Sequence, residues 1–145
     1  RVVGVKNSSM PVQDIQMFVD AGEGRLAVFN GPDEQFIAGR IMGACGGIGG
    51  TYGVMPRLFL KANALFEAGQ LAEATRLQYD ICRIIYAMVS CHGSMYAVIK
   101  ELLRRKGISC GSVRPPFAPL VQEDMKQVDV CEKMIADAEK TYLGF

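Results

Sequence analysis

Residues 1–9, RVVGVKNSS, form a short apolar run that ends in a lysine, and this stretch sets the pattern for the first third of the chain. The run from Val2 to Lys6 is rich in valine, a β-branched residue that favours strands, so it predicts a short buried strand. A lysine beside apolar walls is costly to keep charged, and such surroundings can turn its amine into a nucleophile. The plainer interpretation of these nine residues is a lysine that points into solvent from a loop.

The same order of apolar run, polar or glycine-rich edge and helix occurs twice more before residue 54. The second run is LAVF, residues 26–29, and it ends in NGPDE, residues 30–34. The third is CGGIGGTYG, residues 45–53, which precedes a helix that we expect to begin near Pro56 and to end before Gly69. Continuous apolar strands that alternate with helices predict a parallel sheet covered by helices.

Two helices are expected between these strands. Ser8, Ser9 and Pro11 are helix-start signals for the first helix, and the glycines that follow it close it. Pro32 suits the first turn of the second helix, and the two acids after it favour the positive end of the helix dipole. We expect this second helix to run to about Met42. The apolar stripe of the first helix consists of Val12, Ile15, Phe18 and Val19.

The edge of the predicted sheet where the strands end is the place to look for function. Barrel folds and doubly wound folds both keep their sites at the C-terminal ends of parallel strands. Lys6, the turn 30–34 and the segment 46–53 all fall on that edge. The sequence therefore predicts that these three segments contribute to one site.

The glycine-rich segment GACGGIGGTYG, residues 43–53, does not match the nucleotide-binding motifs that it brings to mind. In a G-x-G-x-x-G fingerprint that begins at Gly47 and Gly49, the third glycine would fall on Tyr52. No GK[ST] sequence follows for a phosphate loop. Glycines inside a strand indicate either a close approach of backbone and ligand or a tight barrel corner, and the spacing favours neither.

Beyond residue 54 the sequence predicts only helices and one proline-rich connector, SCGSVRPPFAPL, at residues 109–120. Ser94 is expected to cap the helix that Gly107 stops. The methionines on the helical stripes are expected to fill the core. The stripe of the long helix over residues 70–91 consists of Leu71, Ala74, Leu77, Ile81, Ile84, Ile85 and Met88, and that of the last helix of Met125, Val128, Met134, Ile135 and Ala138.

The expected architecture is three β/α units over residues 1–69, followed by a helical region over residues 70–145. Three parallel strands cannot close a barrel and would leave an apolar edge bare, and a full eight-unit barrel takes ~250 residues. The chain starts at Arg1, without an initiator methionine, inside an apolar run. We therefore expect a piece of a longer protein, with the first five units preceding Arg1.

Composition excludes several classes of protein. The 16 basic and 15 acidic residues nearly cancel, so there is no electrostatic footprint for nucleic acid or for an anionic membrane. No apolar run reaches the ~18 residues of a membrane-spanning helix, and nothing resembles a signal peptide.

The cysteines are odd in number, scattered and without a CxxC pair, which indicates reduced core thiols in the cytoplasm rather than a disulfide framework or a zinc site. One alternative is a catalytic pair of Cys91 and His92, although neighbours at a helix end rarely present both groups correctly for nucleophile and base. The five cysteines are Cys45, Cys82, Cys91, Cys110 and Cys131.

Three motifs carry a resemblance to a known family: GVKNSS, then FNGPDEQF, then GGIGGTYGVMP. In this order and spacing they resemble the pyruvate-dependent class I aldolases, the superfamily of dihydrodipicolinate synthase and N-acetylneuraminate lyase. The closer resemblance is to the N-acetylneuraminate lyase branch, with its GxDE turn and its GGIGSTYN-like segment. The likeness runs through VRPPFAPL to the last helix, so it covers essentially the whole chain and matches the C-terminal half of the family's barrel.

The resemblance implies an α/β fold, the last three β/α units of a (β/α)8 TIM barrel followed by a C-terminal helical extension. Lys6 would be the Schiff-base lysine, which condenses with the ketone of sialic acid or with pyruvate. The family also implies a cytoplasmic homotetramer that uses no cofactor and no metal and that cleaves sialic acid to pyruvate and N-acetylmannosamine. The residues implied to line the sugar site are Ser8, Gly31, Asp33, Glu34, Gly49 and Gly50.

Two positions depart from the family pattern. Gly50 stands where the lyases usually carry serine, and Ser8 stands where many members have threonine. The family's proton-shuttling tyrosine and its pyruvate-carboxylate loop belong to the N-terminal half, and Tyr52 is not an obvious substitute. The alternatives are another pyruvate aldolase or dihydrodipicolinate synthase of the same superfamily, or a non-catalytic binding fragment.

Overall fold

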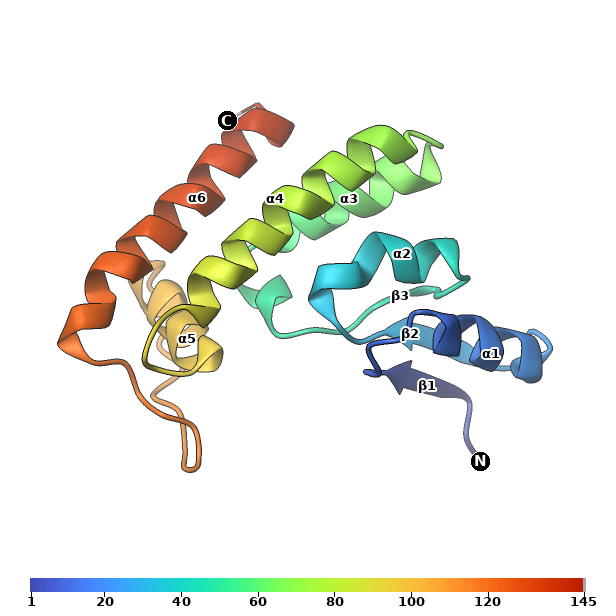
Figure 1. The fold of residues 1–145 in the computed structure, drawn as a ribbon, viewed down its shortest axis with the longest axis horizontal. Coiled ribbons are helices and arrows are strands. Elements are labelled where there is room, and N and C mark those ends of the chain that lie inside the picture. The colour runs from blue at the N-terminus through green and yellow to red at the C-terminus, as the bar shows by residue number, and fades with distance from the viewer. Residues whose placement is uncertain (145) are drawn as a thin grey trace.

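The apolar runs form a parallel sheet, as the sequence predicts, and its three strands lie in the order β1-β2-β3 (Figure 1). A computed structural model of the chain describes residues 1–144 and shows β1 at Gly4–Asn7, β2 at Ala27–Asn30 and β3 at Gly46–Gly47. In this register Asn7 lies beside Asn30, and Asn30 lies beside Gly47. The C-terminal ends of the three strands are therefore level with one another. Phe145, the last residue of the predicted helical region, lies outside the described residues.

The strands are shorter than the runs that predicted them. β1 begins at Gly4 rather than at Val2, and the side chains of Val2 and Val3 are 77% and 73% exposed. β1 begins where its neighbour β2 begins, because Gly4 pairs with Ala27, the first residue of β2. β3 consists of two residues, because the chain turns into a short 3-10 helix at Thr51–Gly53.

Two helices follow the first two strands, as expected. α1, Gln13–Gly22, buries Ile15 against Val28 and Ala44 in a small cluster. Phe18, which the predicted stripe placed inside, is 40% exposed. The helix packs mainly on the short strands β1 and β2, so its buried stripe is narrow and Phe18 lies outside it. α2, Phe36–Ile41, is preceded by a 3-10 turn at Asp33–Gln35 and is followed by Met42 as its C-cap.

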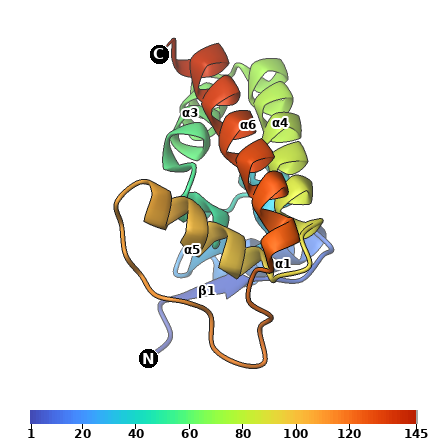
Figure 2. The ribbon, with the colours of Figure 1, turned by 90° about the vertical axis from the view of Figure 1, so that its left-hand side faces the viewer.

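The larger core lies between helices rather than against the sheet. α3, Pro56–Glu67, α4, Leu71–Val89, and α6, Met125–Leu143, run side by side, and α5, Met95–Arg105, crosses at one end of this layer (Figure 2). All predicted positions of the α4 stripe are buried except Leu71, which is 45% exposed because it is the first residue of the helix. The fully buried side chains include Leu58, Leu77, Ile81, Ile84, Ile85, Met88, Val98, Leu102 and Val128.

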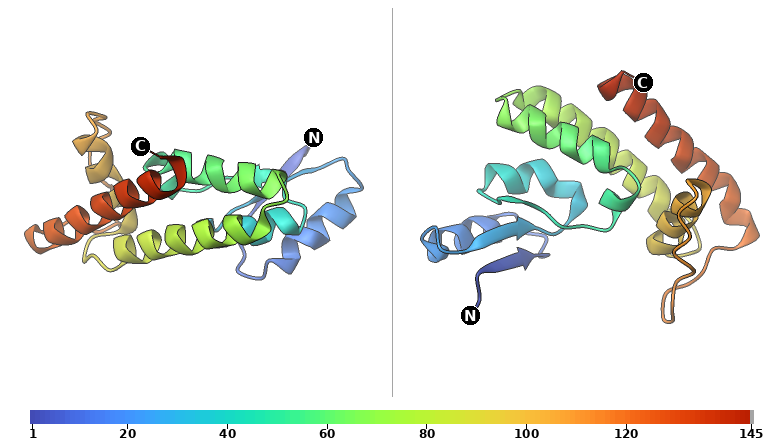
Figure 3. Two further views of the ribbon diagram at one scale, coloured as in Figure 1. Left: turned by 90° about the horizontal axis from the view of Figure 1, so that it is seen from above. Right: turned by 180° about the vertical axis from the view of Figure 1, so that it is seen from behind.

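The start of α5 is fixed by two side chains. Ser94 caps the helix as predicted, since its hydroxyl accepts a hydrogen bond of 3.3 Å from the backbone N–H of Ala97. Asp124, just before α6, accepts backbone hydrogen bonds from His92, Gly93 and Val121 at 2.7, 3.0 and 3.0 Å. Burial alone would raise the pKa of Asp124, but these donors outweigh it and hold that pKa below its usual range. The connector between α5 and α6 extends away from the helices (Figure 3).

The cysteines are free thiols in the described part of the chain, but they are not all core residues. Only Cys131 is buried, whereas Cys45 and Cys110 are exposed. The expectation of five core thiols was therefore wrong, because Cys45 precedes the two-residue strand β3 and Cys110 lies in the connector. Within residues 1–144, no helix combines the length and the apolar character needed to cross a membrane.

The bare edge of β1 generates a prediction for the isolated 15.8 kDa chain. An unpaired strand edge with exposed valines is a template for pairing, so the chain at micromolar concentration should sediment above its monomer mass. Val3→Lys should reduce this association, because a charge on an edge strand opposes pairing, whereas Val130→Lys on α6 should leave it unchanged. A monomer with a cooperative melt would contradict the prediction.

Candidate functional site

The C-terminal edge of the sheet borders a cavity of about 300 Å³. The strands β1 and β2 deliver the turns at residues 8–10 and 31–34 to it, and β3 delivers the segment 49–51. α4 and α5 close the opposite side with Ile85, Met95 and Tyr96. All seven site residues that the sequence predicts line this one cavity: Lys6, Ser8, Gly31, Asp33, Glu34, Gly49 and Gly50.

The strand register explains why the first two turns meet. Gly31 donates its backbone N–H to the carbonyl of Asn7 at 2.7 Å, and Ile48 donates to the carbonyl of Asn30 at 2.9 Å. A Cβ on Gly31 would lie 2.8 Å from the Cα of Ser8 and would collide with the Ser8 hydroxyl. Only glycine lets the β2 turn come this close to the residues after β1.

Lys6 lies in this cavity but is exposed. Val5, the residue before it, packs against the cluster beneath α1. Because side chains alternate along a strand, Lys6 points to the opposite face of the sheet. The apolar walls that the opening stretch suggested around this amine are therefore not formed by residues 1–144.

Asp33 is buried, and its two carboxylate oxygens differ. Oδ2 accepts hydrogen bonds from the backbone N–H and the hydroxyl of Thr51, at 2.9 and 2.5 Å. Oδ1 is buried without a hydrogen-bond partner among the residues described. Half of this carboxylate therefore joins the β2 turn to the segment after β3, and the other half faces Gly49.

Gln78 on α4 binds the backbone of the turn after β2. Its amide nitrogen donates to the backbone carbonyl of Asp33 at 3.2 Å, and its amide oxygen accepts from the backbone N–H of Ile37 at 3.1 Å. Sequence reasoning identified neither Gln78 nor Thr51. The sequence does carry a signal for Gln78, because this polar residue stands among the apolar residues of the α4 stripe.

Glu34 is half-buried, and its carboxylate has no hydrogen-bond or ion-pair partner within residues 1–144. Its backbone carbonyl accepts a hydrogen bond of 3.2 Å from the thiol of Cys82 on α4. Burial raises the pKa of that thiol, and the nearby Glu34 carboxylate adds to the rise, so the thiol stays a donor. The backbone of Glu34 is therefore held while its carboxylate stays available to a ligand.

Side chains of this protein require a glycine at position 47, the second residue of β3. A Cβ on Gly47 would lie 2.9 Å from the Phe36 ring and would collide with the hydroxyl of Tyr52. Tyr52 packs against Phe59 with 3.9 Å between ring centroids. Burial, and then the Asp33 carboxylate, raise the pKa of Tyr52 well above its ordinary value, so this phenol keeps its proton.

The alternative pair, Cys91 and His92, has no catalytic geometry. Burial raises the pKa of the Cys91 thiol, and the Asp124 carboxylate adds to the rise, which disfavours the thiolate that a nucleophile needs. Nδ1 of His92 lies 3.0 Å from Oδ1 of Asp124 rather than beside the thiol. Within residues 1–144, no three His, Cys, Asp or Glu side chains are grouped to hold a metal ion.

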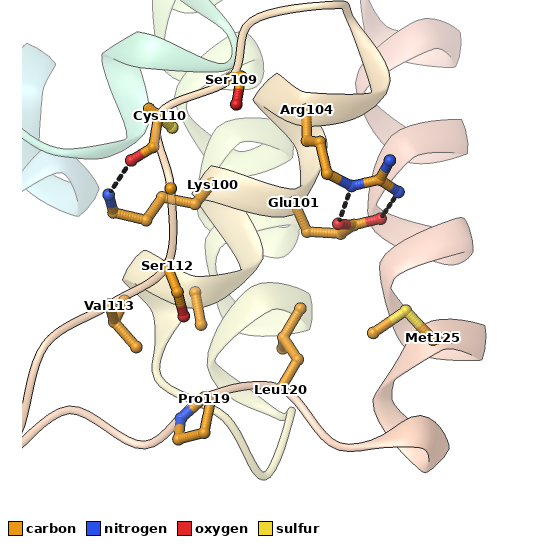
Figure 4. Close-up of a pocket in the computed structure, with 12 residues that line it drawn as sticks. Lys100, Glu101, Arg104, Ser109, Cys110, Ser112, Val113, Pro119, Leu120 and Met125 are labelled. Carbon is orange, nitrogen blue, oxygen red and sulfur yellow. Dashed lines mark hydrogen bonds and ion pairs between the residues drawn. The ribbon is translucent and has the colours of Figure 1, made fainter.

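A second hollow, of about 350 Å³, separates α5 from the connector (Figure 4). Its charged groups are already paired. Nζ of Lys100 donates to the carbonyl of Cys110 at 2.7 Å, and Arg104 donates to both oxygens of Glu101 at 2.7 and 2.8 Å. Chiefly through the hydrogen bond from Arg104, the pKa of Glu101 falls to about 2. The bond from Lys100 attaches the connector to α5, whereas the bonds between Arg104 and Glu101 lie within α5.

Comparison with known proteins identifies relatives over nearly the whole chain. The profile of the dihydrodipicolinate synthetase family matches residues 1–135. An N-acetylneuraminate lyase of Mediterraneibacter gnavus is 54% identical over 143 residues, which are 98% of this chain and 45% of that protein. The chain thus spans about half the length of this curated relative.

Solved structures agree with this match. The wild-type sialic acid aldolase of Ruminococcus gnavus is 54% identical and superimposes with a TM-score of 0.94 over 97% of this chain and 47% of that chain. A catalytic lysine mutant of the same aldolase superimposes with a TM-score of 0.95 at 54% identity, with the same shares of each chain.

The tight fit behind Gly49 can be tested by substitution. A Cβ at Gly49 would overlap Oδ1 of Asp33, so Gly49→Ala should destabilise the fold by about 2 kcal/mol, the cost of overpacking a filled site. Gly53→Ala is the matched control, because nothing lies within 4 Å of its Cβ position. Urea unfolding should be measured on a chimera, called the gnavus chimera below, in which the unmatched N-terminal part of the Mediterraneibacter gnavus relative precedes residues 1–145. Equal unfolding midpoints for the two variants would contradict the overlap.

Proposed function

Because this chain belongs to the dihydrodipicolinate synthetase family, we propose that it is the C-terminal part of a Schiff-base aldolase that cleaves N-acetylneuraminate to pyruvate and N-acetylmannosamine. In this proposal the three β/α units are the last three of a (β/α)8 barrel. One observation carries the proposal: Lys6 lines the same cavity as the Glu34 carboxylate, which no residue of the described chain engages. The 54% identity to a protein named N-acetylneuraminate lyase, and the catalytic lysine of the Ruminococcus gnavus aldolase, support it.

Lys6 is assigned the role of nucleophile. Its neutral amine attacks the ketone carbon of the sugar acid, and loss of water leaves a protonated imine. Removal of the proton from the hydroxyl one carbon beyond the adjacent methylene then breaks the carbon–carbon bond. The electron pair of that bond moves into the imine, which becomes the enamine of pyruvate, and N-acetylmannosamine leaves as the aldehyde. Protonation of the enamine and hydrolysis release pyruvate and restore the lysine.

The N-terminal part of the protein has to complete this chemistry. It would supply the base that takes the hydroxyl proton, the loop that binds the pyruvate carboxylate and the apolar cover that Lys6 lacks here. Such a cover would favour the neutral amine, because burial disfavours a charged ammonium. A cytoplasmic homotetramer remains a prediction from the family resemblance.

The acidic turn is assigned to the hydroxyl-rich end of the sugar. An ionised carboxylate accepts several hydrogen bonds, so it suits a ligand that offers a row of hydroxyl donors. Glu34 is the main candidate, because its carboxylate is unpaired within the described chain while its backbone is held by Cys82. Asp33 has only Oδ1 to offer, since Oδ2 is bound to Thr51. Ser8 adds a hydroxyl on the same side of the cavity.

The Schiff-base role of Lys6 predicts the outcome of reductive trapping. Borohydride added with pyruvate should attach a pyruvate-derived mass to the peptide that contains Lys6 in the gnavus chimera. Lys6→Arg keeps the charge but removes the amine that can lose its proton, so trapping and sugar cleavage should both fall to background. Lys126→Arg, at an exposed position of α6, is the control and should behave as the parent. Substantial cleavage by the Lys6→Arg variant would exclude the assignment.

The role of Glu34 predicts a separation of the two ends of the substrate. Glu34→Gln should raise the KM for N-acetylneuraminate by roughly tenfold, as expected for a lost charge-assisted hydrogen bond, and leave pyruvate trapping at Lys6 intact. Glu123→Gln, at an exposed position before α6, is the control. The assignment would be wrong if Glu34→Gln abolished pyruvate trapping as well. Unchanged KM for the sugar would equally remove Glu34 from the sugar site.

A further inference from the structure

We infer that Tyr96, on the first turn of α5, determines substrate specificity at this site by occupying the space beside Gly50 and contacting the hydroxyl-bearing chain of the sugar acid. The inference rests on the proposed function and deepens it. Sequence reasoning gave Tyr96 no role, and it is remote in sequence from the three strand ends that supply the other polar residues.

Gly50 is a glycine for reasons of space. Its φ of −71° and ψ of −39° are ordinary right-handed values that any residue adopts, so the backbone does not require glycine. A Cβ at Gly50 would lie 2.8 Å from Cε1 of Tyr96, closer than real Cβ contacts. The next ring carbon, Cζ, which bears the phenol hydroxyl, lies 3.6 Å from the same point. The tyrosine ring thus takes the volume that a side chain at residue 50 would fill.

The ring has support on one side and is open on the other. It meets Phe117 of the connector edge-to-face, with 5.4 Å between centroids and 64° between planes. Ser94 caps the first turn of α5, on which Tyr96 lies, and so fixes where this helix begins. Tyr96 is still 45% exposed, and its hydroxyl has no hydrogen-bond partner in the part of the chain described. A positioned ring with an unpaired hydroxyl can therefore receive a ligand.

The position of the ring indicates which part of the ligand it contacts. Lys6 stands at one wall of the cavity, on β1, and Tyr96 comes from α5, on the helical side that closes it. The ketone end of the ligand is bound to Lys6, so the far end of the carbon chain lies toward Tyr96, Gly50 and the acidic turn. A phenol suits that end, because its ring packs against C–H groups while its hydroxyl donates and accepts one hydrogen bond.

The test compares two substrates in the gnavus chimera. Tyr96→Phe keeps the ring and removes the hydroxyl, so the KM for N-acetylneuraminate should rise about fivefold while kcat and pyruvate trapping at Lys6 stay unchanged. A truncated 2-oxo sugar acid that lacks the terminal hydroxyl-bearing carbons should show no change in KM. Tyr79→Phe, on an exposed tyrosine of α4, is the control variant.

A double-mutant cycle tests the shared space. Gly50→Ser should raise the KM when Tyr96 is present, because the new Cβ displaces the ring, and should have little further effect in the Tyr96→Ala background. Equal KM changes for the long and the truncated substrate in Tyr96→Phe would overturn the inference, as would no change for either. Additive effects in the cycle would also overturn it. If the parent chimera fails to trap pyruvate at Lys6, the proposed function falls first and the inference falls with it.

Discussion

The buried carboxylate of Asp33 joins the segments on which the site depends. One oxygen binds the backbone N–H and the hydroxyl of Thr51, which sets the chain after β3 beside the turn after β2. The backbone carbonyl of the same residue accepts from Gln78, which attaches that turn to α4. Burying a carboxylate is costly unless it is hydrogen-bonded, and the two bonds from Thr51 offset part of this cost at Oδ2. Asp33 therefore links the turn after β2, the segment after β3 and α4 beside the cavity.

The distribution of the core explains how the rest of the chain supports that arrangement. The helices α3, α4, α5 and α6 share one large apolar cluster, whereas α1 shares with the sheet only a small cluster around Ile15. The helical layer therefore holds most of the buried apolar side chains, and it reaches the site through Gln78 and Cys82 on α4 and through Tyr96 on α5. The sheet contributes Lys6, the proposed nucleophile, but little of the stabilising apolar contact.

This division also separates the functions of neighbouring residues. Asp33 and Glu34 are adjacent acids in one turn, yet Oδ2 of the first is bound to Thr51, whereas the carboxylate of the second has no partner within residues 1–144. Gly49 and Gly50 are adjacent glycines, yet the first makes room for Asp33 and the second for Tyr96. In each pair, two similar residues have different roles because their surroundings in the folded chain differ.

The family resemblance implied the individual substrate-binding residues. The pattern of the sequence itself determined the alternation of strands and helices, the Ser94 cap and the common edge of Lys6, the turn 30–34 and the segment 46–53. These features follow from local periodicity and from the rule that parallel strands end at the same edge, so they require no knowledge of long-range contacts. Only the tertiary structure decided that Phe18 and Cys45 are exposed and that Lys6 lacks apolar cover from the described residues. It alone brought Gln78 and Tyr96 to the site, and it alone showed that Thr51, within the predicted segment 46–53, binds Asp33. Their positions depend on how helices and turns distant in sequence pack together, and a linear pattern carries no measure of that packing.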